Sequence, residues 1–280
     1  MFKISRVKKE ASFERQNEHY HSFYEFYYLV SGERKIFLNG KNYKVKSGDM
    51  MLIPKREIHR TTFYGEGSEH ERIAMSFDDE AAKRIIDSIG RQTFEQCFME
   101  RQLSIPEEDR GYLEGLFEKI LIEYENVDEF SPLLCQMYGE EIVLFVIRCQ
   151  RKNHGDNASG NRNEVVESIS KEDLEMENAA QYMNEHFMEP LTLPMMAEKY
   201  CMSDSYFSRR FKQVTGFGFK EYLNMVRIRY ACELLIMTDM SVTEISEACG
   251  YMDSNYFGDA FCKRIKMSPR QYRKEKKWKI

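Results

Sequence analysis

The chain has 280 residues, of which 42% are hydrophobic and 31% charged, and its formal net charge is −5. This composition predicts a globular protein with enough apolar residues for two hydrophobic cores. It contains no run of about 18 apolar residues, which excludes a membrane span, and its first residues lack the apolar segment of a signal peptide.

Cysteine usage and charge distribution indicate the cellular compartment and the kind of partner. The seven cysteines never occur as C-x-x-C, so neither a disulfide framework nor a zinc ribbon is expected, and a reducing cytoplasm fits. The charge is uneven: residues 191–280 contain 16 Lys and Arg against 10 Asp and Glu, whereas the rest of the chain is acidic. This asymmetry indicates a nucleic-acid-binding module near the carboxy terminus.

Residues 1–78 have the pattern of β-strands. Short aromatic or β-branched runs such as EFYYLV and GDMMLIP alternate with Gly, Asn or Asp, and Asn39–Gly40 is a strong hairpin signal. Many short strands in succession predict a sandwich or barrel.

Two histidine-containing motifs lie within these strands. His19-x-His21-x(3)-Glu25 with Gly32, followed by Gly48-x(5)-Pro54-x(4)-His59, resembles the two motifs of cupin barrels, although Arg56 and Phe63 depart from the usual Gly and Asn. Alternation along one strand is expected to place every second residue from position 19 to position 27 on a single face. The candidate ligand-binding residues are His19, His21, Phe23, Glu25, Tyr27 and His59.

This cluster has two interpretations. His19, His21, Glu25 and His59 form a plausible ligand set for divalent Zn, Ni, Fe or Mn. The alternative is a polar lining for a small-molecule pocket.

Residues 79–150 have helical periodicity, and the stretch Val143–Ile147 (VLFVI) is apolar on more than one face. Either this helix is buried in a core or it forms the seam of a homodimer, and we predict a dimer through residues 79–150. Residues 151–170 are rich in Asn, Gly, Ser and charge, which predicts a linker. Residues 171–280 are predicted to be helical.

Two copies of a helix-turn-helix pattern occupy this last segment. Ser203 is expected to cap a helix that stops at Gly216, and Asp253 to cap the corresponding helix of the second copy. Residues 219–235 are expected to form one long helix between the copies, while Ser241-Val-Thr-Glu244 reads as a capping box.

Several spaced motifs, over about residues 175–277, resemble the AraC family of bacterial regulators. They are S-x-x-Y-F-x-R-x-F-K (from Ser203, shifted by one residue in places), Y-x(4)-R-x(3)-A-x-x-L-L (from Tyr222), I-x(4)-G-Y (from Ile245), Y-F-x(3)-F (from Tyr256) and S-P-x-x-Y-R (from Ser268). Lys266 stands where the family usually has Gly. The resemblance implies an α+β multidomain fold, with an amino-terminal cupin-like barrel, trailing helices and an all-α double helix-turn-helix.

The resemblance also implies which residues contact DNA. Phe207 and Phe211, like Phe257 and Phe261, are expected to point inward, leaving the opposite face of each recognition helix for the major groove. Asp259 is expected to be repelled by phosphates, so the second unit should read fewer bases than the first. Base contacts are expected from Ser205, Ser208, Arg209, Ser254, Asn255 and Asp259, and phosphate contacts from Arg210, Lys212, Lys263 and Arg264.

Two functions follow from these patterns. The first is a cytoplasmic transcription regulator, by family resemblance an activator, that binds double-stranded DNA, senses a small molecule such as a sugar and, as an activator, contacts RNA polymerase. The second is a metal-dependent cupin enzyme with an accessory helical domain. The double helix-turn-helix favours the regulator, because a cupin enzyme has no use for it.

Overall fold

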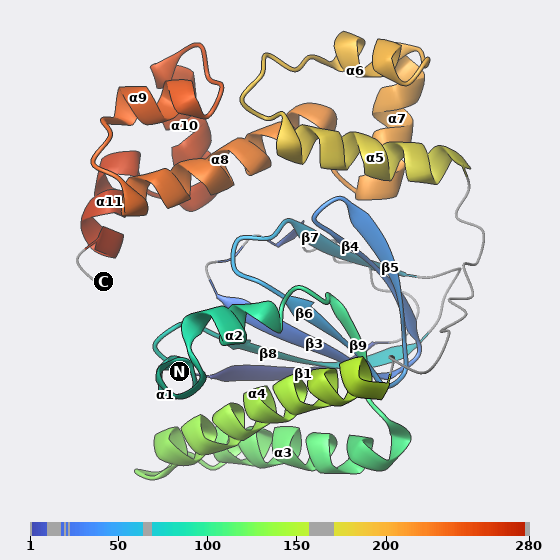
Figure 1. Ribbon diagram of the computed structural model, residues 1–280, viewed down its shortest axis with the longest axis vertical. Coiled ribbons are helices and arrows are strands. Elements are labelled where there is room, and N and C mark those ends of the chain that lie inside the picture. Colours follow the sequence, from blue (N-terminus) through green and yellow to red (C-terminus); the bar gives the residue numbers. More distant parts are fainter. Residues whose placement is uncertain are drawn as a thin grey trace. The chain divides into compact units, whose positions relative to one another are not determined.

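The computed structural model describes residues 2–9, 18–19, 21, 23–63, 69–156 and 171–277. These residues divide into two compact units, the first built on the β-strands and helices α1 to α4, the second on helices α5 to α11 (Figure 1). Within the described ranges, no helix is both long and apolar enough to cross a membrane.

The strands of the first unit form two antiparallel sheets. The larger sheet has the strand order β1 (Lys3–Lys9), β8 (His70–Phe77), β3 (Tyr24–Ser31), β6 (Asp49–Ile53) and β9 (Gln102–Ser104). The smaller sheet has the order β2 (Glu18–His19), β7 (His59–Phe63), β4 (Glu33–Leu38) and β5 (Lys41–Lys46). Their inner faces share one apolar core, to which β3 contributes Leu29 and β4 contributes Ile36, so the expected cupin-like double sheet is confirmed.

Strand β3 separates two cores, because successive side chains of a strand point to opposite faces. Tyr24, Phe26 and Tyr28 pack against the helices, whereas Tyr27 and Leu29 belong to the core between the sheets. Glu25 has the same parity as Tyr27 and lies opposite Ile53, another member of the inner core. A carboxylate is thereby placed on the inner side of the larger sheet.

Helices α1 (Lys83–Ile89), α2 (Arg91–Gln96), α3 (Glu107–Glu125) and α4 (Ser131–Asp156) supply the second core of this unit. Val143, Val146 and Ile147 are buried in that core, which explains why the VLFVI stretch is apolar. Of its two interpretations, burial in the unit's own core therefore accounts for most of the stretch. Leu144 is the exception, with 41% of its surface exposed.

The domain limits differ from those expected at two places. The segment 79–150 is not a separate helical domain, because it contains strand β9 and its helices share a core with β3 and β8. Helix α4 also continues to Asp156, so residues 151–156 of the predicted linker are helical. The remaining linker residues, 157–170, lie outside the described ranges.

The second unit is helical, as expected. Its helices are α5 (Lys171–Glu185), α6 (Leu193–Lys199), α7 (Asp204–Thr215), α8 (Phe219–Met237), α9 (Val242–Ala248), α10 (Ser254–Ile265) and α11 (Pro269–Lys277). The side chains of Ser203 and Asp253 cap α7 and α10, and Ser241 with Glu244 forms a capping box at α9. Each cap satisfies backbone N–H groups that a helix start leaves without partners, so the local prediction of these helix starts is confirmed.

Candidate functional site

The first helix-turn-helix unit presents one polar face of α7. Phe207 and Phe211 are fully buried four residues apart, which orients α7 on its hydrophobic side. Ser205, Arg209 and Lys212 are exposed on the other side. The guanidinium of Arg209 lies 5.6 Å from the centre of the Tyr206 ring, a cation–π distance that restrains this long side chain before any ligand binds.

The second helix-turn-helix unit repeats this geometry with different side chains. Asp204 begins α7 and Ser254 begins α10, so equivalent positions in the two helices differ by 50 in number. Arg209 therefore corresponds to Asp259, and both are exposed. An acidic side chain occupies in α10 the position that a basic one occupies in α7.

The same offset pairs the remaining residues of the two helices. Ser205 corresponds to Asn255 and not to Ser254, because the turn before α10 is one residue longer than the turn before α7. The side chains of Ser254, Asn255 and Lys263 are exposed, whereas those of Ser208 and Arg264 are half-buried.

Arg210 does not share the exposed face of α7. Its guanidinium donates to Asp173 of α5 at 2.7 Å and lies 3.6 Å from Glu172, and only 19% of the side chain is exposed. This residue fixes α5 against α7, and the phosphate contact expected of Arg210 stays a prediction that would require the pair with Asp173 to be shared or broken. The sequence gives no local signal for the pairing, because 37 positions separate Arg210 from Asp173.

Arg227, the arginine of the motif that starts at Tyr222, has a role that sequence reasoning missed: it connects the two helix-turn-helix units. Arg227, in the middle of α8, is buried and donates from Nε to the carbonyl of Phe187 at 2.9 Å and from Nη2 to that of Glu189 at 2.8 Å. Its guanidinium also lies 5.3 Å from the ring centre of Tyr251 in the second unit. Burial lowers the pKa of Arg227, but a guanidinium titrates so far above neutrality that it stays charged.

The backbone makes a second connection at the same place. Gly250 has φ +79°, and a Cβ atom added there would lie 2.6 Å from the carbonyl oxygen of Met188. The turn of the second unit therefore rests directly on the chain between α5 and α6. Arg227 and Gly250 thus both tie the segment 187–189 to the second helix-turn-helix unit.

The sensor-side cluster contains three of the four expected metal ligands. His21 Nε2 lies 2.8 Å from Glu25 Oε2, and His59 Nε2 lies 3.6 Å from the same oxygen. The ligand atoms of these three residues all lie within 4.8 Å of one another. Their side chains are 10%, 13% and 3% exposed for His21, Glu25 and His59 respectively, so the cluster is largely shielded from solvent.

The electrostatics of this cluster centre on Glu25. Burial by itself would raise the pKa of Glu25, but hydrogen bonds and charge interactions with His21 and His59 outweigh it and hold that pKa well below its usual range. The carboxylate is therefore ionised at neutral pH.

The expected single strand from residue 19 to residue 27 is not continuous. His19 belongs to β2 and Glu25 to β3, with His21 and Phe23 between the strands. His21 is placed instead by its carbonyl, which accepts from Arg56 N–H at 2.8 Å, and by its ring, which stacks on Phe23 at 3.8 Å between centres.

Of the other candidates, Tyr27 is buried in the core between the sheets. The backbone of His19 pairs with that of His59, but the side chain of His19 lies outside the described part of the structure.

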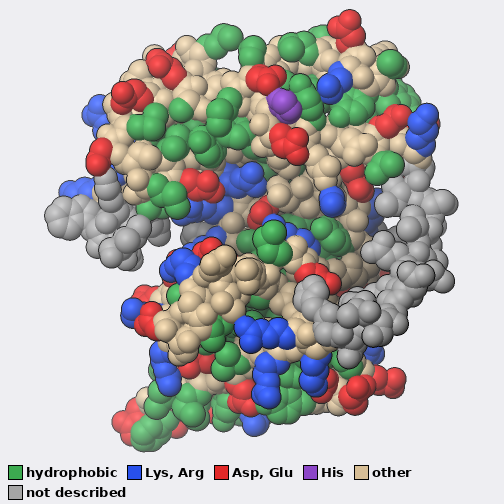
Figure 2. All heavy atoms as spheres, in the orientation of Figure 1, with side chains coloured by type: hydrophobic (Ala, Val, Ile, Leu, Met, Phe, Trp, Pro, Cys, Tyr) green, Lys and Arg blue, Asp and Glu red, His purple; other side chains and the backbone are tan. Residues whose placement is uncertain are grey.

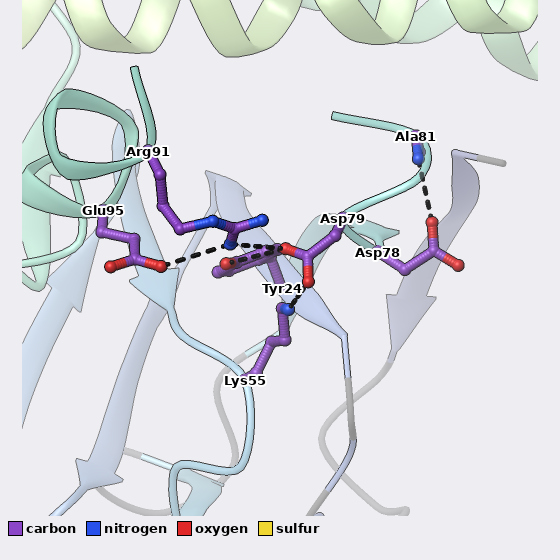
Figure 3. A network of polar contacts seen from close by, with 7 residues as sticks. All are labelled: Tyr24, Lys55, Asp78, Asp79, Ala81, Arg91 and Glu95. Atoms are coloured by element: carbon purple, nitrogen blue, oxygen red, sulfur yellow. Dashed lines mark hydrogen bonds and ion pairs between the residues drawn. The ribbon is translucent and has the colours of Figure 1, made fainter. Parts of the chain in front are cut away.

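A charged network holds β3 next to this cluster (Figure 3). The hydroxyl of Tyr24 donates to Asp79 at 3.2 Å, and Lys55 and Arg91 pair with the same carboxylate. These contacts fix Tyr24, the first residue of β3, and Glu25 is the second residue of that strand. The network is a structural support and not part of the cluster.

Comparison with known families agrees with this two-part architecture. Residues 7–143 match an AraC-like ligand binding domain, and residues 196–275 match a helix-turn-helix domain. Fold and motifs together define a DNA-binding transcription regulator with a ligand-binding domain. The chain belongs to the AraC family, with an amino-terminal sensor domain of the cupin-like type.

Curated relatives support the same assignment. The chain is 25% identical over 255 residues to the transcriptional activator RhaR of Mannheimia succiniciproducens, a match covering 91% of this chain and 86% of RhaR. It is 23% identical over 269 residues to the activator RhaS of an Enterobacter species, covering 91% and 87%. The regulator YijO of Escherichia coli is 34% identical over 110 residues, but this match spans only 39% of each protein. These relatives are regulators, which favours this class over a cupin enzyme.

Solved structures include similar chains. The carboxy-terminal domain of AraT from Geobacillus stearothermophilus is 38% identical, with a TM-score of 0.36, and the match covers 38% of this chain and 88% of that one. ToxT of Vibrio cholerae is 14% identical with a TM-score of 0.38, over 97% and 98% of the two chains.

Proposed function

We propose that this protein binds a specific DNA sequence by inserting α7 and α10 into successive major grooves. The observation that carries the proposal is the pair of polar faces on these helices, each backed by two buried phenylalanines. In a helix-turn-helix the second helix reads base edges. Arg209 is exposed and carries the group that pairs with guanine, and Asn255 is exposed and carries the group that pairs with adenine.

The two helices contribute unequally in this proposal. Arg209 in α7 adds a positive charge toward the DNA, whereas Asp259 at the equivalent position of α10 adds a negative one. The first unit then supplies most of the base-specific contacts and the second mainly fixes position. Lys212 and Lys263 are the phosphate-binding candidates, Ser205, Ser208 and Ser254 supply hydrogen-bonding hydroxyls, and Arg264 is a further basic group on α10.

Footprinting tests the docking directly. Two recognition helices on one face of a duplex should lie about one helical turn apart, roughly 34 Å. The full chain, and its segment 172–280, should each protect at least about one and a half turns per protomer. A shorter protected region would contradict docking by both units.

We further propose that the amino-terminal domain responds to a small polar effector, with a sugar as the first candidate class. Support comes from the match to a ligand-binding domain and from the concentration of His21, Glu25 and His59 beside Phe23 and Tyr27. Imidazoles, a carboxylate and a phenol can each hydrogen-bond a hydroxyl, and an aromatic ring can pack on the apolar face of a sugar.

Thermal shift of the full chain against a panel of neutral and acidic sugars is the matching experiment. Tyr27→Phe removes only a hydroxyl and should weaken binding without unfolding the domain, while Tyr43→Phe, on β5 of the smaller sheet, serves as a control. An effector whose affinity is unchanged in Tyr27→Phe and in Glu25→Gln would place the binding site elsewhere.

A homodimer remains part of the proposal, on a revised surface. Since most of VLFVI is buried, we place the dimer contact on the apolar side chains exposed along α4: Leu133, Met137 and Leu144, which are 58%, 51% and 41% exposed. Hydrophobic side chains are visible where α3 leads into α4 (Figure 2). Paired half-sites on DNA require such a dimer.

Sedimentation of Met137→Glu against wild type tests the dimer. Met99→Glu, at a position that is 78% exposed and not on α4, is the control. A wild-type monomer at micromolar concentration, with and without effector, would contradict the proposed dimer. As an activator working in the cytoplasm, the DNA-bound dimer would contact RNA polymerase, and transcription in a reconstituted system tests this step.

A further inference from the structure

The two imidazoles of the sensor cluster are fixed in one tautomer by the backbone. His21 Nδ1 lies 2.8 Å from the carbonyl oxygen of Phe23, and His59 Nδ1 lies 3.0 Å from that of Glu57. A carbonyl oxygen only accepts hydrogen bonds, so each Nδ1 must carry the proton. In a neutral imidazole the other nitrogen, Nε2, then has a lone pair and no proton.

Both of these lone pairs are directed at an anion. The Nε2 atoms of His21 and His59 lie 2.8 Å and 3.6 Å from Glu25 Oε2. With neutral imidazoles, three electron-rich atoms would face one another in a largely buried site, which is unfavourable. The cluster therefore requires either a proton or a metal cation between its members.

The donor set and spacing fit a metal ion. Ligand atoms at about 2.0–2.2 Å from a tetrahedral Zn²⁺ lie roughly 3.3–3.6 Å from one another. The His59–Glu25 separation of 3.6 Å falls in that range, and the His21–Glu25 separation of 2.8 Å would have to open by roughly 0.5 Å. The Nδ1–carbonyl hydrogen bonds are the outer-shell contacts that orient histidine ligands of metals. Two imidazoles with one carboxylate select a borderline cation such as Zn²⁺ over Mg²⁺ or Ca²⁺.

We propose that His21, Glu25 and His59 bind one divalent transition-metal ion per chain, with Zn²⁺ as the reference ion. Three protein ligands leave a coordination position open to water or to an oxygen of an effector. This consequence for sensing rests on the sensor role proposed above, whereas metal binding itself does not. His19, whose backbone pairs with that of His59, is the fourth candidate ligand named from the sequence.

Titration of the full-length, tag-free protein with Zn²⁺ tests the site. After treatment with a chelator, isothermal titration calorimetry should show one ion per chain, and Zn²⁺ should raise the melting temperature. Mg²⁺ at the same concentration should do neither. Glu25→Gln, nearly isosteric, and His59→Ala should each lose more than the ~10–100-fold in affinity that outer-shell changes cost.

The matched control is His186→Ala. This histidine lies in the other unit and contacts Glu189, so its replacement should leave zinc affinity unchanged. Circular dichroism checks that each variant is folded. Should His59→Ala fail to fold, X-ray absorption of zinc-loaded wild type still decides, because it should show two imidazole ligands and no sulfur.

Three results would overturn the proposal. They are the absence of zinc binding to wild type at micromolar concentration, equal affinity in Glu25→Gln, and sulfur in the zinc coordination shell. In the first case a proton, and not a metal cation, lies between the members of the cluster. None of these results bears on DNA binding, which is tested with different residues, so the two proposals fail separately.

Discussion

Replacing Lys266 with glycine should stabilise the second helix-turn-helix unit. Lys266 ends α10 in the left-handed conformation, with φ +64° and ψ +17°, and its N–H donates to Cys262 O at 2.9 Å. Gly216 ends α7 in the same way, with φ +87° and an N–H···O bond of 2.8 Å to Lys212. The two units thus share one C-cap geometry but only the first uses glycine there.

The expected size of the effect follows from the backbone. An L-residue in the left-handed region costs about 1–2 kcal/mol because its Cβ crowds the carbonyl oxygen, and glycine avoids this cost. The lysine charge at a helix C-terminus offsets part of it, by about 0.3–1 kcal/mol. Lys266→Ala removes the charge and keeps the strain, so Lys266→Gly should exceed Lys266→Ala in stability by about 1–2 kcal/mol.

Hydrogen exchange on the full chain measures this difference locally. Amides of α10 should exchange roughly five- to thirty-fold more slowly in Lys266→Gly than in Lys266→Ala. The mirror change, Gly216→Ala, should accelerate exchange in α7. Equal exchange in the two Lys266 variants would refute the assignment of backbone strain to this residue.

Further predictions concern DNA contacts, packing and thiol reactivity. Arg209→Ala should relax base preference at one position of the DNA site and cost about 1–3 kcal/mol of binding free energy. Lys212→Ala should weaken binding to all sequences alike and reduce by about one the slope of log binding constant against log salt concentration. A uniform loss of affinity for Arg209→Ala would make Arg209 a phosphate contact. Asp259→Asn should strengthen binding to every duplex, measured by fluorescence anisotropy, and an unchanged affinity would remove this residue from the interface. Gly250→Ala should destabilise the carboxy-terminal unit by about 2 kcal/mol or more in urea unfolding, because φ is +79° and the new Cβ would lie 2.6 Å from Met188 O; a neutral effect would contradict that close approach. At pH 8 a thiol reagent should modify the exposed Cys201 and Cys262 but not Cys97 or Cys249, since burial raises the pKa of each of the latter two thiols to about 12. Specific DNA should protect Cys262, which occupies in α10 the position of Lys212 in α7.

Local sequence patterns determined the helices of the second unit. Ser203, Ser241 and Asp253 start their helices as predicted because a cap needs only a side chain and an N–H two or three residues later. The buried pairs Phe207–Phe211 and Phe257–Phe261 follow from the helical repeat alone. The family motifs identified the two helix-turn-helix units and the helix that links them.

Only the tertiary structure shows which residues make contact when they are far apart in the sequence. His59 approaches Glu25 only because β7 belongs to one sheet and β3 to the other, and His21 reaches them from an irregular segment that strand alternation could not predict. Arg210 faces α5 and not the exposed face of α7, since Asp173 lies within hydrogen-bond distance.

The burial of residues 143–147 and the contacts of Arg227 also depend on packing between distant parts of the chain. Whether an apolar helix is core or interface depends on what covers it. The core shared by the strands and helices of the first unit buries Val143, Val146 and Ile147, whereas Leu144 stays exposed. Arg227 gains its partners from the carbonyls of Phe187 and Glu189, about 40 residues away. Capping and periodicity are properties of neighbouring residues, whereas burial and ion pairing are properties of the packed chain, and only the latter need the fold to be known.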